Sequence, residues 1–269
     1  MISKKKDQIR KLLKGIETGD PESVTVVNED KYIQHNPLTR EGSEGLAELF
    51  RRLSQTAPRV NIVRTFEDGD YVFAHTDYNF NVLEIGFEVF RFEDGLAVEH
   101  WDNLQHKHSS LNPSGHTMID GPTEVTDLDK TEMNRELVRS FVDEVLINGQ
   151  LDKLEHYIDA EGYTEHNPHM ADGLSALRSA LAEPASNGKR MIQYNQIHRL
   201  LAEGNFLLCV SEGFRNGVHS SFYDLFRVAD GKLVEHWDTT EAIPPRTEWK
   251  NEKPNCNGPA PITRRFSVI

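Results

Sequence analysis

The chain has few cysteines, no surplus of positive charge and no long apolar run. Its two cysteines, Cys209 and Cys256, form no Cys-x-x-Cys pair, so we expect no framework of disulfides. Thirty Lys and Arg stand against 43 Asp and Glu, which gives a net charge of −13. Because a chain this acidic repels phosphate backbones, nucleic acid is not an expected partner.

Membrane and targeting signals are also missing. No apolar stretch approaches the roughly 20 residues that a membrane span needs, and the basic residues 4–6 are followed by polar residues, unlike a secretory signal. We therefore expect a cytoplasmic protein without membrane contacts. With 37% hydrophobic and 27% charged residues, the 269-residue chain has the composition of globular proteins and the length of two domains.

Two sequence motifs occur twice, in the same order. The segment Tyr-Ile-Gln-His-Asn-Pro at 32–37 recurs at 163–168 as Tyr-Thr-Glu-His-Asn-Pro, and residues 90–102 recur at 226–238 with nine of thirteen positions identical. Such a repeat predicts a duplicated domain. We assign the first copy to residues 1–105, a linker to 106–131, the second copy to 132–246 and a tail to 247–269.

Each copy begins with helical patterns and ends with strand patterns. Ile9, Leu12, Leu13 and Ile16 form one apolar stripe on a helix that ends near Gly19. Further helices are predicted over 46–53, 137–146 and 174–181, and strands over 71–78, 87–92, 96–102, 206–212, 222–228 and 233–238, with Asp-Gly turns at 94–95 and 230–231. The predicted fold class is α+β: two tandem domains, each a curved antiparallel sheet with helices covering one face.

The last strand of each copy carries the candidate chemistry. Alternation places His100 and Asp102 on one face and Glu99 and Trp101 on the other. The second copy repeats these letters up to Asp238. Two interpretations stay open at this point: a His–Asp pair that lines a pocket, or a Trp in the core beside a His–Asp pair that caps the strand.

The neighbouring strand brings further acids. With the turn at 94–95, antiparallel pairing sets Asp102 opposite Phe87 or Glu88, and Asp238 opposite Tyr223 or Asp224. Two acids in an apolar cup separate in pKa, so one serves as a base while the other keeps its proton. The alternative is that Glu88 and Asp224 are solvated residues on the outside.

The preceding strand and the Asn-Pro loop add polar groups. His75 and Asp77 share a face where the second copy has Val210 and Glu212, so we expect the first pocket to be the more polar one and the site of the chemistry. The bond before proline forces an extended or turn conformation. From this fixed loop, His35 and Asn36 either donate to a ligand or tie the loop to the sheet, and His166 and Asn167 repeat them.

Other chemistries find no support. The chain contains no Gly-x-Ser-x-Gly, P-loop or dinucleotide fingerprint, so we expect no cofactor. Its tightest histidine cluster is His106-Lys107-His108, and no His-Glu-x-x-His occurs. We therefore expect no metal.

Together, the two repeated motifs resemble the SnoaL-like branch of the NTF2-like superfamily. The resemblance implies a cone of curved sheet with helices closing an apolar pocket, and pairing through the outer sheet face, here between the two copies of one chain. Further self-association stays open. SnoaL polyketide cyclases close a ring by a cofactor-free aldol reaction with an aspartate as acid and base, which by position resembles Asp102 and Asp238. They keep a histidine where this chain has Glu88 and Asp224.

We therefore expect an acid/base enzyme without a cofactor that acts on a small or polycyclic carbonyl compound as an aldol cyclase, isomerase or dehydratase. The alternative is a non-catalytic binding protein for a small apolar ligand. The candidate catalytic residues are Asp102, His100, His35, Glu88 and His75, with Asp238, His236, His166 and Asp224 in the second copy. The candidate ligand-binding residues are Asn36, Tyr32, Trp101 and Phe90, with Asn167, Tyr163, Trp237 and Phe226 in the second copy.

Overall fold

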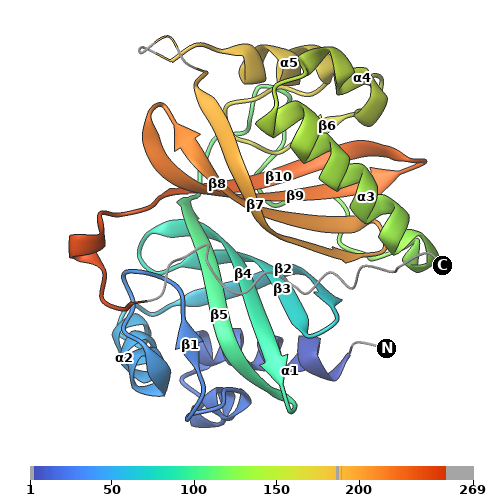
Figure 1. Cartoon of the computed structure of the whole chain (residues 1–269). Helices are drawn as coiled ribbons and strands as arrows, with labels where there is room; N and C mark the ends of the chain where they lie inside the picture. Colours follow the sequence, from blue (N-terminus) through green and yellow to red (C-terminus); the bar gives the residue numbers. More distant parts are fainter. Residues whose placement is uncertain (1–2, 186–187, 189, 253–269) are drawn as a thin grey trace, which may run out of the picture.

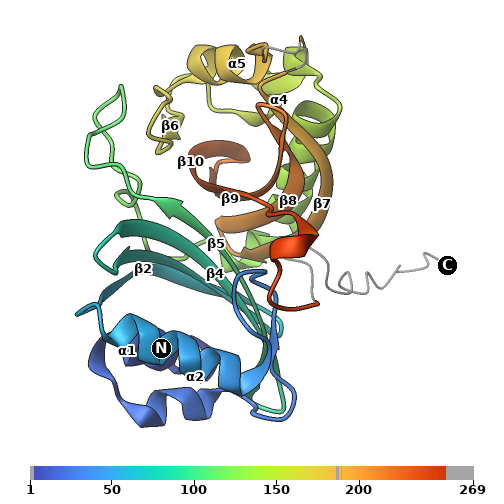
Figure 2. The ribbon, with the colours of Figure 1, turned by 90° about the vertical axis from the view of Figure 1, so that its left-hand side faces the viewer.

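The computed structural model describes residues 3–185, 188 and 190–252, so Cys256 and the other residues of the predicted tail from 253 onward lie outside the described residues. Two five-stranded sheets face each other in the middle of the molecule, and the helices of each repeat lie on the face of their own sheet that points away from the other repeat (Figures 1 and 2). Among the described residues, no helix is both long and apolar enough to cross a membrane.

The first repeat starts with the predicted amphipathic helix. Helix α1 spans Lys4–Thr18, where the Ser3 side chain accepts a hydrogen bond from the Lys6 N–H and Gly19 ends the helix at a φ of 69°. The remaining elements are β1 (Ile33–Gln34), α2 (Gly42–Ser54), β2 (Arg59–Asp68), β3 (Tyr71–Asn79), β4 (Leu83–Glu93) and β5 (Leu96–His106). The strand order is β1-β5-β4-β3-β2.

The second repeat has the same strand order, β6-β10-β9-β8-β7, so the duplication predicted from the motifs extends to the whole topology. Helix α3 spans Thr131–Phe141 and continues as a π-helical turn over Val142–Ile147. The elements that follow are α4 (Leu154–Tyr157), β6 (Thr164–Glu165), α5 (Leu174–Ala182), β7 (Ile192–Glu203), β8 (Phe206–Arg215), β9 (Val218–Ala229) and β10 (Lys232–Ala242).

Two features of the sheets differ from the sequence prediction. Strands β2 and β7 were not predicted, because a polar Arg64 or Arg199 is buried in the strand and shifts in register interrupt the alternation of apolar residues. The sheets are mixed and not wholly antiparallel, since β1 pairs parallel with β5 and β6 pairs parallel with β10. Two-residue strands are too short to show a period.

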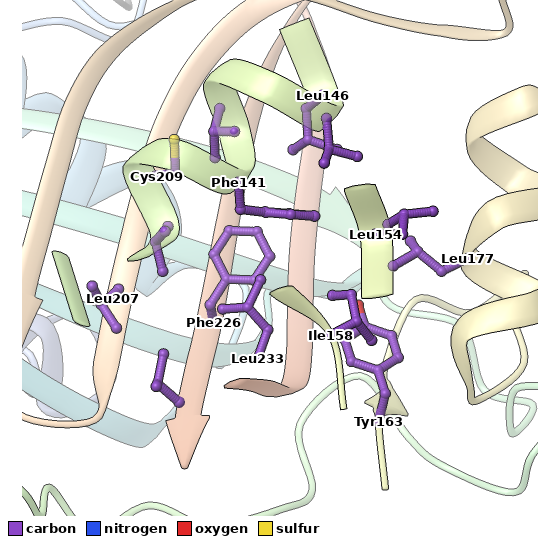
Figure 3. Packing of buried hydrophobic residues seen from close by; sticks show 14 of the residues in the cluster. Phe141, Leu146, Leu154, Ile158, Tyr163, Leu177, Leu207, Cys209, Phe226 and Leu233 are labelled. Atoms are coloured by element: carbon purple, nitrogen blue, oxygen red, sulfur yellow. The ribbon is translucent and has the colours of Figure 1, made fainter. Parts of the chain in front are cut away.

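Each sheet packs its inner face against its own helices. In the second repeat, the ring of Phe141 from α3 meets the ring of Phe226 from β9 edge to face, with the centroids 5.7 Å apart. Leu146 and Leu177 complete this cluster from the helical side (Figure 3). In the first repeat, Ile9 and Leu12 of α1 pack in the equivalent cluster.

The outer faces of the two sheets pack against each other in a third apolar cluster. Phe73, Phe87 and Trp101 come from the first sheet, and Tyr223 and Trp237 come from the second. The linker residue Met118 is buried in the same cluster. Each sheet therefore has its own helices on one face and the other sheet on the opposite face.

Two stacks of side chains cross this interface and are related by the repeat. The Arg199 guanidinium lies 3.8 Å from the ring centroid of Trp101. The His35 ring also stacks on Trp101, with the ring centroids 4.4 Å apart. In the same way, Arg64 lies 4.2 Å from the ring of Trp237, and His166 stacks on that ring at 4.6 Å. Each repeat therefore donates a cation to a tryptophan of the other, as in an isologous dimer interface.

Candidate active site

A cavity of about 440 Å³ lies between helices α1 and α2 and the inner face of the first sheet. Its walls are largely apolar, and its polar groups converge from β4 and β5. Small-molecule sites combine an apolar enclosure with a few placed polar groups in this way. The apolar lining comprises Leu12, Leu13, Ile16, Leu38, Leu46, Leu49, Phe50, Leu53, Phe80, Phe90 and Leu104.

Asp102 of β5 is 7% exposed and faces this cavity. The register places it directly opposite Glu88 of β4, one of the two predicted partners. The Asn36 side-chain amide donates to both carboxylate oxygens of Asp102, at 2.9 and 3.0 Å. Burial, and then the Glu88 carboxylate, raise the pKa of Asp102 to about 6, although the charge of His100 acts in the opposite direction.

His100 and Glu88 form a buried pair beside Asp102. His100 Nε2 lies 2.6 Å from Glu88 Oε2, and Nδ1 lies 3.1 Å from the side-chain amide of Gln34. Tyr78 donates to the other Glu88 oxygen at 2.8 Å. Although burial lowers the pKa of His100, the hydrogen bond that His100 donates to Glu88 and the negative charges of Glu88 and Asp102 raise it overall. Glu88 is therefore not the solvated outward residue of the alternative interpretation.

The Asn-Pro loop is tied to the sheet by its own backbone. The His35 N–H donates to the His100 carbonyl at 2.9 Å, which extends the parallel pairing of β1 with β5. The Asn36 N–H donates to Gln34 Oε1 at 2.9 Å, and Asn36 Oδ1 accepts from the Leu38 N–H at 2.8 Å. With its oxygen held in this way, the Asn36 amide nitrogen is fixed toward Asp102.

The second repeat reproduces the polar groups without the space. Asp238 lies opposite Asp224 in the register and accepts two bonds of 2.9 Å from Asn167. His236 lies between Asp224, at 3.1 Å, and Glu165, at 2.9 Å. Burial raises the pKa of Asp238 to about 6. The cavity here measures only about 40 Å³.

Several residues predicted for the pockets lie on the opposite face of the sheets. Trp101 and His35 are stacked in the interface between the repeats, as are Trp237 and His166. This correction follows from alternation: the outer sheet face is apolar because the other sheet covers it, so the aromatic residues of the motif serve that interface.

His75 is a further correction. It pairs with Phe87 on the outer face, and its Nδ1 lies 2.7 Å from Arg64 Nη1. Burial, and then the Arg64 charge, lower the pKa of His75 well below its usual value. Asp77 forms an ion pair with Lys107 at 2.9 Å and lines no described cavity. The predicted reason for a more polar first pocket is therefore wrong.

Two acidic groups of the first cavity, Glu84 and Glu241, were not among the predicted residues. Alternation with Glu88 could have found Glu84 of β4, but Glu241 comes from β10 of the second repeat. Lys250, beyond β10, also lines the cavity. Tyr32, Asn36, Phe90, His100 and Asp102 line it as expected. Tyr163, Asn167, Phe226, His236 and Asp238 line the small second cavity.

Two groups of described residues have the geometry of a cation site. The ligand atoms of Glu88, His100 and Asp102 lie within 4.8 Å of one another, as do those of His116, Asp120 and His166. The histidines at 106 and 108, singled out in the sequence, belong to neither group. In the first group, His100 Nε2 and Glu88 Oε2 are hydrogen-bonded to each other, so a cation would have to displace this bond.

Comparison with known proteins identifies the fold of the repeat. A family model described as SnoaL-like domain matches residues 9–100. The chain is also similar to TsrD from Streptomyces laurentii, with 20% identity over 39% of this chain and 92% of that one and a TM-score of 0.35. A candidate polyketide cyclase from Bacillus cereus shares 18% identity over 38% and 74% of the two chains, with a TM-score of 0.35.

An LEH-like epoxide hydrolase from M. tuberculosis shares 18% identity over 42% of this chain and 85% of that one, with a TM-score of 0.33. No curated protein matches the chain. The two motifs, the family match and the strand order agree within the first repeat. The first repeat therefore matches a SnoaL-like domain over residues 9–100, and the second repeat is its tandem copy by motif and strand order.

Proposed function

We propose that the first repeat is an acid/base enzyme that needs no cofactor and removes a proton next to the carbonyl group of a small apolar compound. The observation that carries this proposal is the buried carboxyl group of Asp102, which lines the 440 Å³ cavity and is held by the side-chain amide of Asn36. A pKa of about 6 leaves this carboxyl ionised at neutral pH, yet basic enough to accept a proton from carbon.

Tyr32 supplies the second group that such a reaction needs. Its hydroxyl is buried at the cavity and has no hydrogen-bond partner among the described residues. Burial, and then the charges of Asp102 and Glu88, raise the pKa of Tyr32 well above its usual value, so the hydroxyl keeps its proton. An unpaired buried donor is costly, and a substrate carbonyl oxygen would satisfy it.

His100 contributes through its charge. Both of its ring nitrogens already have partners in Glu88 and Gln34, so it is not a free donor. Its raised pKa favours the imidazolium, which stabilises negative charge that develops nearby. Enolate formation of this kind is shared by aldol cyclases, isomerases and dehydratases, and the apolar walls favour a hydrophobic carbonyl substrate.

The test uses exchange of hydrogen next to a carbonyl. We expect the protein to accelerate deuterium incorporation at the α-carbon of 2-tetralone, a bicyclic ketone, measured by NMR in D₂O. Asp102→Asn keeps the size of the side chain and its bond to Asn36 but removes the base, so the rate should fall by about 10²-fold or more.

Asp238→Asn is the matched control, because it makes the same change beside a cavity of about 40 Å³, and it should retain the wild-type rate. Binding of 2-tetralone without any accelerated exchange would favour the non-catalytic binding protein instead. Equal loss of exchange in both variants would contradict the assignment to the first cavity.

A further inference from the structure

The first cavity is completed by a carboxyl group from the second repeat. Strand β10 passes beside β5 where the two sheets meet, and Glu241 near its end lines the first cavity together with Glu84, Glu88 and Asp102. The Leu104 N–H of β5 donates to Glu241 Oε2 at 3.3 Å, which fixes the side chain across the boundary between the repeats.

The repeat supplies an internal comparison for this position. Gln105 follows Asp102 by three residues, as Glu241 follows Asp238. Gln105 also reaches across the interface, where its Oε1 accepts from the Thr240 N–H at 2.8 Å. Gln105 therefore makes its contact with the other repeat through an amide, and the second cavity measures about 40 Å³. Glu241 makes the equivalent contact through a carboxyl group and lines the open first cavity.

We propose that Glu241 is the general acid of the first cavity and gives its proton to the carbonyl oxygen of the substrate. This inference rests on the proposed function. Asp102 takes the proton from the α-carbon, the electrons of that C–H bond form the carbon–carbon double bond, and the carbonyl π electrons move to oxygen. The oxygen then takes the Glu241 proton, which leaves an enol, a protonated Asp102 and an ionised Glu241. Reversal of both proton transfers, at the same or a conjugated carbon, restores the two groups.

The surroundings of Glu241 keep it protonated while Asp102 is ionised. Burial is the main cause that raises its pKa to about 8, and the negative charges of Asp102, Glu84 and Glu88 act in the same direction. Two carboxyl groups in one cavity with pKa values near 6 and 8 provide a base and an acid at neutral pH. The other charged or titratable groups lining the cavity are His100, Arg52, Lys250, Tyr32 and Tyr78.

The segment that follows Glu241 holds this end of the second repeat over the first cavity. The Lys250 N–H donates to the Pro37 carbonyl at 2.7 Å. The Asn251 side-chain amide donates to the carbonyls of Asn36 and Thr39, at 2.6 and 2.9 Å. These bonds reach the loop that fixes Asp102, and Figure 1 shows the segment in red running from the upper sheet down to the first repeat.

The experiment is the pH dependence of 2-tetralone exchange in the full chain. We expect a bell-shaped profile in the wild type: the rate rises as Asp102 loses its proton near pH 6 and falls as Glu241 loses its proton near pH 8. Glu241→Gln keeps an acceptor for the Leu104 N–H, so the variant should fold. Its rate at pH 7 should fall about 10²-fold, and the fall near pH 8 should disappear.

Gln105→Glu is the matched control and should leave unchanged the exchange rate, its rise near pH 6 and its fall near pH 8. A difference infrared spectrum at pH 7, wild type minus Glu241→Gln, should contain the C=O band of one protonated carboxyl group. The role of Glu241 would be overturned if Glu241→Gln kept the wild-type exchange rate and its fall near pH 8. It would also be overturned if the C=O band were absent. A wild type that exchanges no α-hydrogen overturns the proposed function itself, so the two failures differ.

Discussion

Consecutive residues at the end of β5 serve two different environments, because neighbouring side chains of a strand point to opposite faces. His100 and Asp102 face the cavity, whereas Trp101 lies in the interface between the sheets. Strand β5 therefore contributes both to the cavity and to the interface between the repeats. It carries the proposed base Asp102 and also Trp101, on whose ring Arg199 of the other repeat stacks.

Tyr32 and its counterpart Tyr163 provide a prediction at this scale. The Tyr32 hydroxyl has no partner among the described residues, whereas the Tyr163 hydroxyl donates to Glu165 at 3.0 Å. Tyr32→Phe should therefore keep the unfolding free energy within about 0.5 kcal/mol of the wild type while the 2-tetralone exchange rate falls about tenfold or more.

Tyr163→Phe should show the reverse pattern, a loss of about 1 kcal/mol in urea denaturation with the exchange rate intact. If Tyr32→Phe lost stability and kept its rate, the hydroxyl would be a structural group and not a donor to substrate.

Arg64 connects strand β2 to the linker between the repeats. Arg64 of β2 donates through Nη2 to the carbonyls of Ile119 and Asp120, at 3.2 and 2.9 Å, and through Nε to the Pro122 carbonyl at 3.2 Å. Its guanidinium also covers Trp237. One buried cation thus fixes the linker, the first sheet and the second sheet to each other.

Replacing Arg64 should therefore affect folding more than chemistry. Arg64→Met keeps much of the apolar volume but leaves buried carbonyls without a donor, and we expect a loss of about 2–4 kcal/mol in the unfolding free energy. Urea denaturation at constant pH measures it. Arg59→Met, at an exposed position of the same strand, is the control and should change stability by less than about 0.5 kcal/mol. If Arg64→Met and Arg59→Met lost the same unfolding free energy, the role given to Arg64 would be refuted.

At the scale of the whole molecule, duplication has produced an asymmetric pair. Both repeats keep a buried aspartate held by an asparagine, yet the cavities measure about 440 and 40 Å³. The second repeat covers the outer face of the first sheet and sends Glu241 into the first cavity.

This arrangement predicts how the first repeat behaves alone. Residues 1–122 would expose Phe73, Phe87 and Trp101 of the outer face to water, and apolar patches of this kind associate. We expect this fragment to form dimers or larger species in light scattering after size exclusion, at concentrations where the full chain does not change its state. The same fragment with Phe87→Lys should associate less. A fragment that stays monomeric and folded would show that the interface is dispensable.

The sequence alone determined the features that depend on local pattern. Apolar periods placed the helices, and the Asp-Gly turns placed the hairpins that bring β4 beside β5 and β9 beside β10. Both residues of each turn, Asp94 with Gly95 and Asp230 with Gly231, have the positive φ that such tight hairpins require. The turns therefore predicted two candidate partners for Asp102, and the register shift between Arg91 and Phe92 selects Glu88 instead of Phe87.

Only the tertiary structure decided which face of each sheet encloses a cavity and which meets the other repeat. Alternation divides strand residues into two sets, but both faces are covered here, so the pattern does not say that Trp101 and His75 belong to the interface. Arg64 and Glu241 find their partners in distant segments. Such contacts arise when the two sheets pack, and no local period in the chain encodes them.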